Sequence, residues 1–290
     1  MLLLAGTLPV DDDSVVVGPI AYDGAVLSVG DRPVPAEMMT LGATAMMAAA
    51  SVTSRALGAD PPMGVMSGDL GDGRGSRRVY RFLADRAGEI GASAVTVHYI
   101  LPLRQEFMDF VEMVDYWEKR PFLIADAGAM LIAKATGLCD KFDLFTPDAG
   151  EMAFLADPDA GHPAYVRAVL FDRDTVNVPE LVSLAYSARN APRYLAIKGP
   201  VDFVVDNGKI AYTVDQPEVP ALEAVGGTGD TVTGIISALI ASGTEPTRAS
   251  LVALRANRLA GRLCSATPAT GVFEMVKSIG EAVTTVMDAL

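Results

Sequence analysis

Short apolar runs alternate with longer amphipathic stretches along almost the whole chain. A run such as Ala94–Tyr99 has the length of a buried strand, whereas Gln105–Trp117 has the apolar spacing of a helix. This alternation is typical of a parallel sheet with helices on both faces. The sequence therefore predicts an α/β fold, a three-layer α/β/α sandwich with a mainly parallel central sheet.

The expected elements follow from length and periodicity. Strands are expected at Leu2–Ala5, Val15–Val17, Ala25–Val29, Met63–Met66, Ala94–Tyr99, Phe122–Ala125, Leu144–Phe145, Tyr194–Ile197, Phe203–Val205 and Ile210–Thr213. Helices are expected at Leu41–Leu57, Gly75–Ile90, Gln105–Trp117, Ala127–Ala135, Ala149–Leu155, Pro179–Arg189, Thr231–Ser242, Thr247–Cys264 and Phe273–Met287. Asn207-Gly208 predicts a β-hairpin, because these residues tolerate the positive φ angles of a tight turn.

Composition suits one compact domain covering residues 1–290. Half of the 290 residues are hydrophobic and only 20% are charged, so the chain has enough apolar surface to fold by itself. Residues 156–178 combine Asp and Pro with weak periodicity, which indicates an irregular connection, either a lid or an insertion.

Charge and cysteine content exclude several classes of partner. The net charge of -13 argues against a nucleic-acid polymer or an anionic membrane, since both require a basic face. Two cysteines are too few for a disulfide framework, which favours a reducing cytoplasm. The apolar start at Met1 lacks a basic segment, and no apolar run is long enough to span a membrane. The oligomeric state stays open, and a homo-oligomer is compatible with the sequence.

The stretch Val225–Gly234 reads V-G-G-T-G-D-T-V-T-G and precedes an amphipathic helix. Helix N-termini bind anions through free N–H groups, and Gly226, Gly227, Thr228 and Gly229 would let the backbone approach a phosphate closely. Asp230 would then act as a base that takes a proton from an attacking hydroxyl, while the amides stabilise the developing charge. The alternative is a simple helix cap, which Asp favours.

Two further segments carry candidate ligands. Asp148 and Glu151 lie three residues apart at an expected helix start, where they could organise Mg²⁺ or simply form a capping box. Lys198-Gly199 follows an expected strand and could direct a cation at a phosphate, although a lone surface lysine is usually just solvated.

A second glycine-rich loop, starting at Gly68-Asp69, also lies between an expected strand and helix. Its polar groups could hydrogen-bond a polyhydroxylated substrate, but a solvated turn explains the pattern equally well. His98 and His162 form no metal motif, so both are interpreted as structural.

Taken together, these residues make the chain similar to the ribokinase-like superfamily. The C-terminal half most resembles the dehydratase domain that repairs hydrated NAD(P)H at the expense of ATP or ADP. Its G-G-T-G-D-x-L-T-G motif is matched by Gly226–Gly234, its T-P-H-x-G-E motif by Thr146–Glu151, and its D-A-D-A segment partly by Ala125–Ala127. Asp148 stands in place of the motif histidine, and Gly128 follows Ala127 where the family has its second Asp.

The N-terminal half is more similar to the substrate-binding half of sugar kinases in the same superfamily. The resemblance implies ATP or ADP beside the glycine motif and Lys198, Mg²⁺ at Glu151 and Asp148, and a small substrate at Gly68, Asp69 and Asp126. It implies an ATP-dependent kinase with Asp230 as base. A nucleotide-dependent dehydratase and a non-catalytic nucleotide-binding protein are the alternatives.

Overall fold

A single mixed sheet forms the centre of the computed structural model, which describes residues 1–35, 40, 42–166 and 177–290. Its parallel part pairs in the order β9-β8-β7-β6-β1-β5. The strands span β1 (Leu2–Leu8), β5 (Met63–Gly68), β6 (Ala94–Val97), β7 (Phe122–Ala125), β8 (Leu144–Phe145) and β9 (Tyr194–Ile197). Antiparallel strands extend both edges: β2 (Val16–Tyr22), β3 (Val26–Val29) and β4 (Arg32–Pro35) beyond β5, and β10 (Asp202–Asp206) and β11 (Lys209–Val214) beyond β9.

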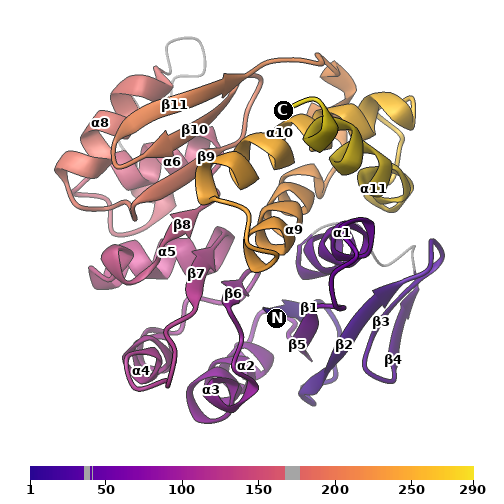
Figure 1. Cartoon of the computed structure of the whole chain (residues 1–290). Coiled ribbons are helices and arrows are strands. Elements are labelled where there is room, and N and C mark those ends of the chain that lie inside the picture. The colour runs from indigo at the N-terminus through magenta and orange to yellow at the C-terminus, as the bar shows by residue number, and fades with distance from the viewer. Residues whose placement is uncertain (36–39, 41, 167–176) are drawn as a thin grey trace.

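Helices cover both faces of the sheet, as Figure 1 shows. One layer holds α1 (Ala43–Ala56), α9 (Thr228–Ala241), α10 (Pro246–Leu263) and α11 (Val272–Asp288). The other holds α2 (Arg74–Asp85), α3 (Ala87–Ile90), α4 (Arg104–Val114), α5 (Ala127–Thr136), α6 (Ala149–Ala156) and α8 (Val178–Ser187). In β1, Leu2 and Leu4 pack into the first core and Leu3 and Ala5 into the second, as strand alternation requires. The predicted three-layer α/β/α sandwich is confirmed.

Some boundaries differ from the expectation. Strand β4 was not among the expected strands. It contains Pro33 and Pro35, which it tolerates because it lies at the edge of the sheet. The helix predicted over Gly75–Ile90 is divided at Arg86, whose φ of -130° is not helical. Leu41, the predicted start of the first helix, lies outside the described residues, as does 167–176 within the predicted irregular connection.

The predicted hairpin joins β10 and β11. Asn207 and Gly208 have φ angles of 50° and 79°, the left-handed conformations that a tight hairpin turn requires. This prediction is confirmed.

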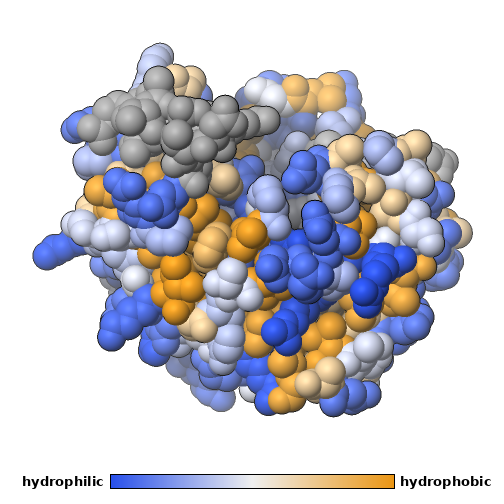
Figure 2. Space-filling model, turned by 90° about the horizontal axis from the view of Figure 1, so that it is seen from above, coloured by the Kyte–Doolittle hydropathy of each residue, from blue (hydrophilic) through white to orange (hydrophobic). Residues whose placement is uncertain are grey.

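The helices of the described residues include none that is long and apolar enough to cross a membrane. Figure 2 shows hydrophobic residues interspersed with hydrophilic ones over one face of the molecule.

Gly234, the last residue of the glycine motif, has a packing role where α9 crosses α1. A Cβ at this position would lie 2.2 Å from the Met46 carbonyl oxygen, well inside contact distance. Gly234→Ala should therefore destabilise the protein by about 1–3 kcal/mol, as overpacking does. Gly280→Ala in α11 is the matched control, because its Cβ would make only ordinary contacts at 3.6 Å or more. Urea unfolding compares the two, and equal stabilities would contradict the packing role.

Candidate active site

The glycine motif spans the turn that leads into α9 and the first residues of that helix. Gly227 precedes the helix with a φ of 90°, a conformation that glycine adopts without strain. The helix begins at Thr228, three residues earlier than predicted, so Thr228, Gly229 and Asp230 lie inside its first turn. Free N–H groups and the positive end of the helix dipole meet there, which is the geometry that the predicted anion site requires.

A neighbouring helix, α10, holds this turn in place. The Asn257 amide donates a hydrogen bond of 3.1 Å to the Thr228 carbonyl, and Thr231 Oγ1 donates one of 2.6 Å to Asn257 Oδ1. Both Asn257 and Thr231 are buried. The first turn of α9, where the anion site is predicted, is therefore held firmly in place.

Asp230 extends from this turn toward the sheet. Its Oδ1 lies 2.8 Å from His98 Nε2, and its Oδ2 accepts a hydrogen bond from the Gly42 backbone N–H. Burial by itself would raise the pKa of Asp230, but the hydrogen bond from His98 and the charges of His98 and Lys198 lower it to about 2. The carboxylate is thus ionised throughout the neutral range.

Asp126 caps α5 at the end of β7 and is almost fully buried. It accepts hydrogen bonds from the Ala127 N–H at 2.8 Å and from Thr233 Oγ1 at 2.6 Å. The ammonium of Lys198 lies 3.0 Å and 3.2 Å from its two oxygens. The structure therefore brings Asp126 and Lys198 together beside α9, and the predicted substrate role of Asp126 stays a prediction.

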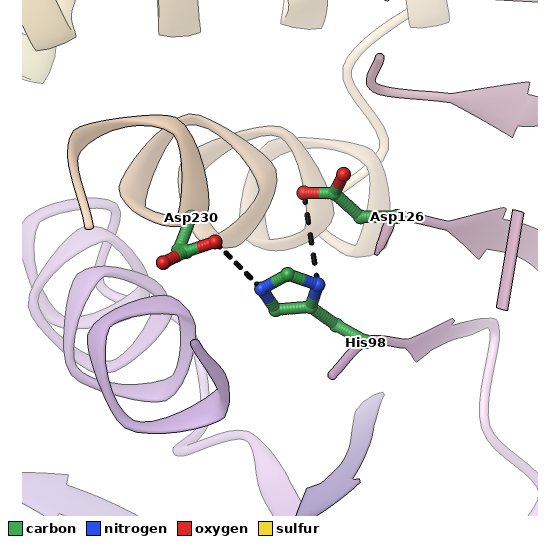
Figure 3. Close-up of side chains that lie close together, drawn as sticks. All are labelled: His98, Asp126 and Asp230. Atoms are coloured by element: carbon green, nitrogen blue, oxygen red, sulfur yellow. Dashed lines mark hydrogen bonds and ion pairs between the residues drawn. The ribbon is translucent and has the colours of Figure 1, made fainter. Parts of the chain in front are cut away.

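His98, which the sequence pattern did not identify as a site residue, lies between the two aspartates (Figure 3). Its side chain is 1% exposed, and its Nδ1 lies 3.7 Å from Asp126 Oδ2 without a hydrogen-bond partner among the described residues. Burial favours the neutral ring, but the charges of Asp126 and Asp230 outweigh it, so the pKa of His98 is raised. A protonated His98 would join Lys198 in balancing the charge of the two carboxylates.

His98, Asp126 and Asp230 also offer three metal-ligand atoms within 4.8 Å of one another. However, His98 Nε2 already bonds directly to Asp230, and Lys198 already neutralises Asp126. The arrangement therefore suits a hydrogen-bonded array of charges better than a metal site.

Lys198 reaches the motif because the turn after β9 is fixed. A Cβ on Gly229 would lie 3.4 Å from Lys198 Nζ, which places the ammonium beside the first turn of α9. The adjacent Gly199 N–H donates to Asp202, and Arg258 donates to the Gly199 carbonyl at 2.9 Å. Burial by itself would lower the pKa of Lys198. The charges of Asp126 and the other nearby acids outweigh burial, so the pKa is raised and the side chain stays charged.

Asp148 and Glu151 form the capping box of α6. Asp148 Oδ1 accepts from the Glu151 N–H at 2.8 Å, and Glu151 Oε2 accepts from the Asp148 N–H at 2.9 Å. Burial, together with the charges of Asp126 and Asp148, raises the pKa of Glu151 to about 7. This crowding of negative charge is what a divalent cation would relieve, so the two residues remain candidate Mg²⁺ ligands.

Further along the same edge, Gly68 is the last residue of β5 and Asp69 follows it directly. The Asp69 carboxylate accepts hydrogen bonds from the N–H groups of Gly71, Gly73 and Ser76, and from Ser76 Oγ at 2.7 Å. It thereby shapes its own loop, and these bonds would compete with the predicted bonds to a substrate. The substrate role of Gly68 and Asp69 stays a prediction.

The raised pKa of His98 has a measurable consequence for stability. A group whose pKa is raised by folding stabilises the protein fully below its ordinary value, here 6.5, and this contribution is lost as pH rises through the folded pKa. Between about pH 6 and about pH 9, the wild type should therefore lose more stability than His98→Asn. His162→Asn, at an exposed position, should follow the wild type. Thermal melting at the two pH values checks this, and parallel curves for His98→Asn would contradict it.

The protein shares its fold with ribokinase-like enzymes of known structure. The hydroxyethylthiazole kinase of Pyrococcus horikoshii superposes with a TM-score of 0.55 at 18% identity, covering 100% of this chain and 91% of that one. The ADP/ATP-dependent NAD(P)H-hydrate dehydratase of Bacillus subtilis gives 0.52 at 15% identity, with coverage of 98% and 89%. Such low identities establish the fold alone.

Sequence similarity then identifies the family. A family model described as NAD(P)H-hydrate dehydratase matches residues 101–281. An uncharacterized protein of Methanocaldococcus jannaschii, MJ1337, is 37% identical over 75% of this chain and 89% of its own length. The bifunctional NAD(P)H-hydrate repair enzyme Nnr of Hyperthermus butylicus is 36% identical over 36% of this chain, which is 20% of that protein. The chain belongs to the NAD(P)H-hydrate dehydratase family, and the predicted resemblance and enzyme class are confirmed.

Proposed function

We propose that the protein is an ATP- or ADP-dependent dehydratase that acts on hydrated NADH or NADPH. The observation that carries this proposal is the position of Asp230: an ionised carboxylate at the anion-binding start of α9, beside Lys198, in a chain of this family. A base next to an anion site is what transfer of a phosphoryl group to a hydroxyl requires.

In the first step, the oxygen of the substrate hydroxyl would attack the terminal phosphorus of the nucleotide, and Asp230 would accept the proton of that hydroxyl. The bond from phosphorus to the bridging oxygen breaks, and ADP leaves when ATP is the donor. The amides of Gly227–Asp230 and Lys198 would stabilise the charge on the transferred group. The resulting phosphate ester then loses phosphate as its C–O bond breaks and a proton leaves the adjacent carbon, which forms the double bond of the dihydronicotinamide.

Glu151 and Asp148 would hold Mg²⁺ at the same edge of the sheet. The cation would neutralise charge on the nucleotide phosphates. Support comes from the capping-box geometry, which places the two carboxylates side by side. Further support comes from the raised pKa of Glu151, which burial causes first and the charges of Asp126 and Asp148 increase, although Lys198 opposes the rise.

A kinase that stops at the phosphate ester is the second candidate, and one observation favours it. The family match begins at residue 101, so it leaves out β1, β5 and β6, which form the half of the site where the acceptor would lie. A sugar or another hydroxyl compound would then be the acceptor. Both candidates share the phosphoryl-transfer step and differ in the fate of the phosphate ester.

Incubation with ATP or ADP, Mg²⁺ and hydrated NADH tests the proposal. We expect the absorbance at ~340 nm to be restored, because the dehydrated product is NADH, and a sugar panel should give no phosphosugar. Accumulation of a phosphosugar would favour the kinase.

Nucleotide binding can be tested separately from catalysis. ATP at about 100 times its Kd should stabilise the protein by about 2.7 kcal/mol and raise its melting temperature. If melting shifts with ATP but no acceptor is turned over, the protein is a non-catalytic nucleotide-binding protein. If nucleotide produces no shift at millimolar concentration, the nucleotide site itself is wrong.

A further inference from the structure

Tyr99, directly after His98, has a backbone conformation that needs an explanation. Its φ is 54°, in the left-handed region that a bulky residue rarely adopts. Among the described non-glycine residues with positive φ, Tyr99 and Ala127 immediately follow the buried site residues His98 and Asp126. Strained conformations persist where the surrounding structure enforces them, and they concentrate at functional sites.

Contacts with Thr7, Gly42 and His98 enforce this conformation. The Tyr99 carbonyl accepts hydrogen bonds from Thr7 Oγ1 at 2.6 Å and from the Thr7 N–H at 3.2 Å. Gly42 packs so closely on the ring that a Cβ at this position would lie 2.9 Å from Tyr99 Cγ. The His98 ring meets the Tyr99 ring edge-on, with centroids 5.6 Å apart. Tyr99 is therefore firmly positioned.

The same contacts place the Tyr99 ring next to the proposed base. Gly42, which touches the ring, also donates its N–H to Asp230, and His98 bonds to the other oxygen of that carboxylate. Burial and the charge of Asp230 raise the pKa of the Tyr99 hydroxyl. Yet Tyr99 remains 43% exposed, although most large hydrophobic side chains at the strand ends are buried. The protein thus holds an accessible aromatic ring beside the atom that would take the substrate proton.

We propose that Tyr99 is a specificity-determining residue that packs against the nicotinamide-type ring of the acceptor. This inference rests on the proposed function, because it assumes that the acceptor hydroxyl faces Asp230. An aromatic side chain can supply a large, rigid contact surface to a flat ring at low entropic cost. Residue 99 lies outside the region matched by the family model, so the match itself assigns it no role.

Two substitutions separate the ring from the backbone. Tyr99→Phe keeps the ring and loses only the hydroxyl group. Tyr99→Asn loses the ring, but Asn tolerates positive φ better than Tyr does. Tyr165→Asn and Tyr165→Phe are matched controls, because Tyr165 is 77% exposed and makes its ring contact with His162 instead.

The first readout is steady-state turnover of hydrated NADH with ATP. Tyr99→Asn should lower kcat/KM for the acceptor by about 10- to 100-fold, mainly through KM, while KM for ATP stays unchanged. Tyr99→Phe should stay within about threefold of the wild type. The melting temperature of Tyr99→Asn should stay equal or rise by about 2–4 °C, because strain is relieved. A merely structural tyrosine would instead give a lower melting temperature and no selective change in KM.

The second readout is calorimetric binding of NADH, which needs no catalysis. The wild type and Tyr99→Phe should bind NADH about tenfold or more tightly than Tyr99→Asn. Three outcomes would each overturn the role of the ring. Tyr99→Asn could bind NADH as tightly as the wild type, Tyr99→Phe and Tyr99→Asn could lose the same amount of affinity, or the wild type could fail to bind NADH. Turnover by the wild type with an unchanged Tyr99→Asn would overturn this inference and leave the dehydratase proposal intact. Ring-dependent NADH binding without any turnover would overturn the dehydratase proposal and leave the role of the Tyr99 ring intact.

Discussion

Asp230→Asn should reduce turnover by about 10³-fold or more while the protein stays folded. Asparagine keeps the size of the side chain but cannot accept the proton of the substrate hydroxyl. Its amide group also cannot accept hydrogen bonds on both sides, as the carboxylate does from His98 and Gly42. The measurement is single-turnover phosphoryl transfer from ATP, with circular dichroism as the check on folding.

Asp115→Asn is the matched control for this substitution. Asp115 makes an ion pair of 2.6 Å with Lys141 on the surface, so its loss should leave turnover unchanged. An Asp230→Asn enzyme with the wild-type rate would show that another group removes the proton, and the assignment of the base would be wrong.

The pKa of about 2 for Asp230 constrains the timing of proton transfer. A carboxylate this acidic is a poor base toward a free hydroxyl. It becomes adequate once the hydroxyl oxygen has begun to bond to phosphorus, because that oxygen then carries a far more acidic proton. Proton transfer to Asp230 should therefore occur late, and the low pKa keeps the base ionised over the working pH range.

Local patterns in the sequence indicated the glycine motif and Lys198 of the candidate site, and the family resemblance added Asp126. The glycine motif, Lys198 and Asp126 each stand directly beside a well-marked strand or helix. Since parallel strands present their carboxyl ends at one edge, their convergence follows from the predicted fold. The motif could not reveal that Gly234 serves packing against α1, because only the structure shows the Met46 carbonyl next to it.

His98 and Tyr99 were missed for a different reason. The apolar run predicted a strand through Tyr99, whereas β6 ends at Val97. The predicted strand therefore contained both residues, whereas in the structure they follow the carboxyl end of β6. The partner of His98 lies 132 residues away, and no local spacing encodes such a contact. Ligands of such folds bind beyond the carboxyl ends of the parallel strands. If the strand had been predicted to end at Val97, this rule would have pointed to His98 and Tyr99.

Asp69 shows how a local pattern can leave two roles open. A glycine-rich loop with an acid matches both substrate binding and a turn that is closed by the acid's own hydrogen bonds. The four donors around Asp69 demonstrate the second role. Pattern alone cannot weigh these roles, because both use the same residue types.

Arg258→Met should produce the largest loss of stability, about 3–5 kcal/mol, because it leaves a buried carboxylate without its partner. Arg258 Nε lies 2.6 Å from Asp202 Oδ2, and the two side chains are 10% and 8% exposed. The guanidinium also donates to the carbonyls of Gly199 and Pro200 at 2.9 Å and 2.8 Å. These bonds fix the turn that carries Lys198, so the surviving folded enzyme should also bind nucleotide more weakly.

The loss should depend on pH in a defined direction. Burial already raises the pKa of Asp202, although Arg258 opposes the rise. Without Arg258 the pKa rises further, so the variant is helped by protonation at low pH and loses stability as pH rises through the folded pKa. Arg262→Met, one turn along the same helix at an exposed position, should have little effect at any pH. Urea unfolding at about pH 5 and about pH 8 measures both variants. A pH-independent loss would mean that the missing bonds to Gly199 and Pro200, and not the uncompensated charge of Asp202, account for the instability.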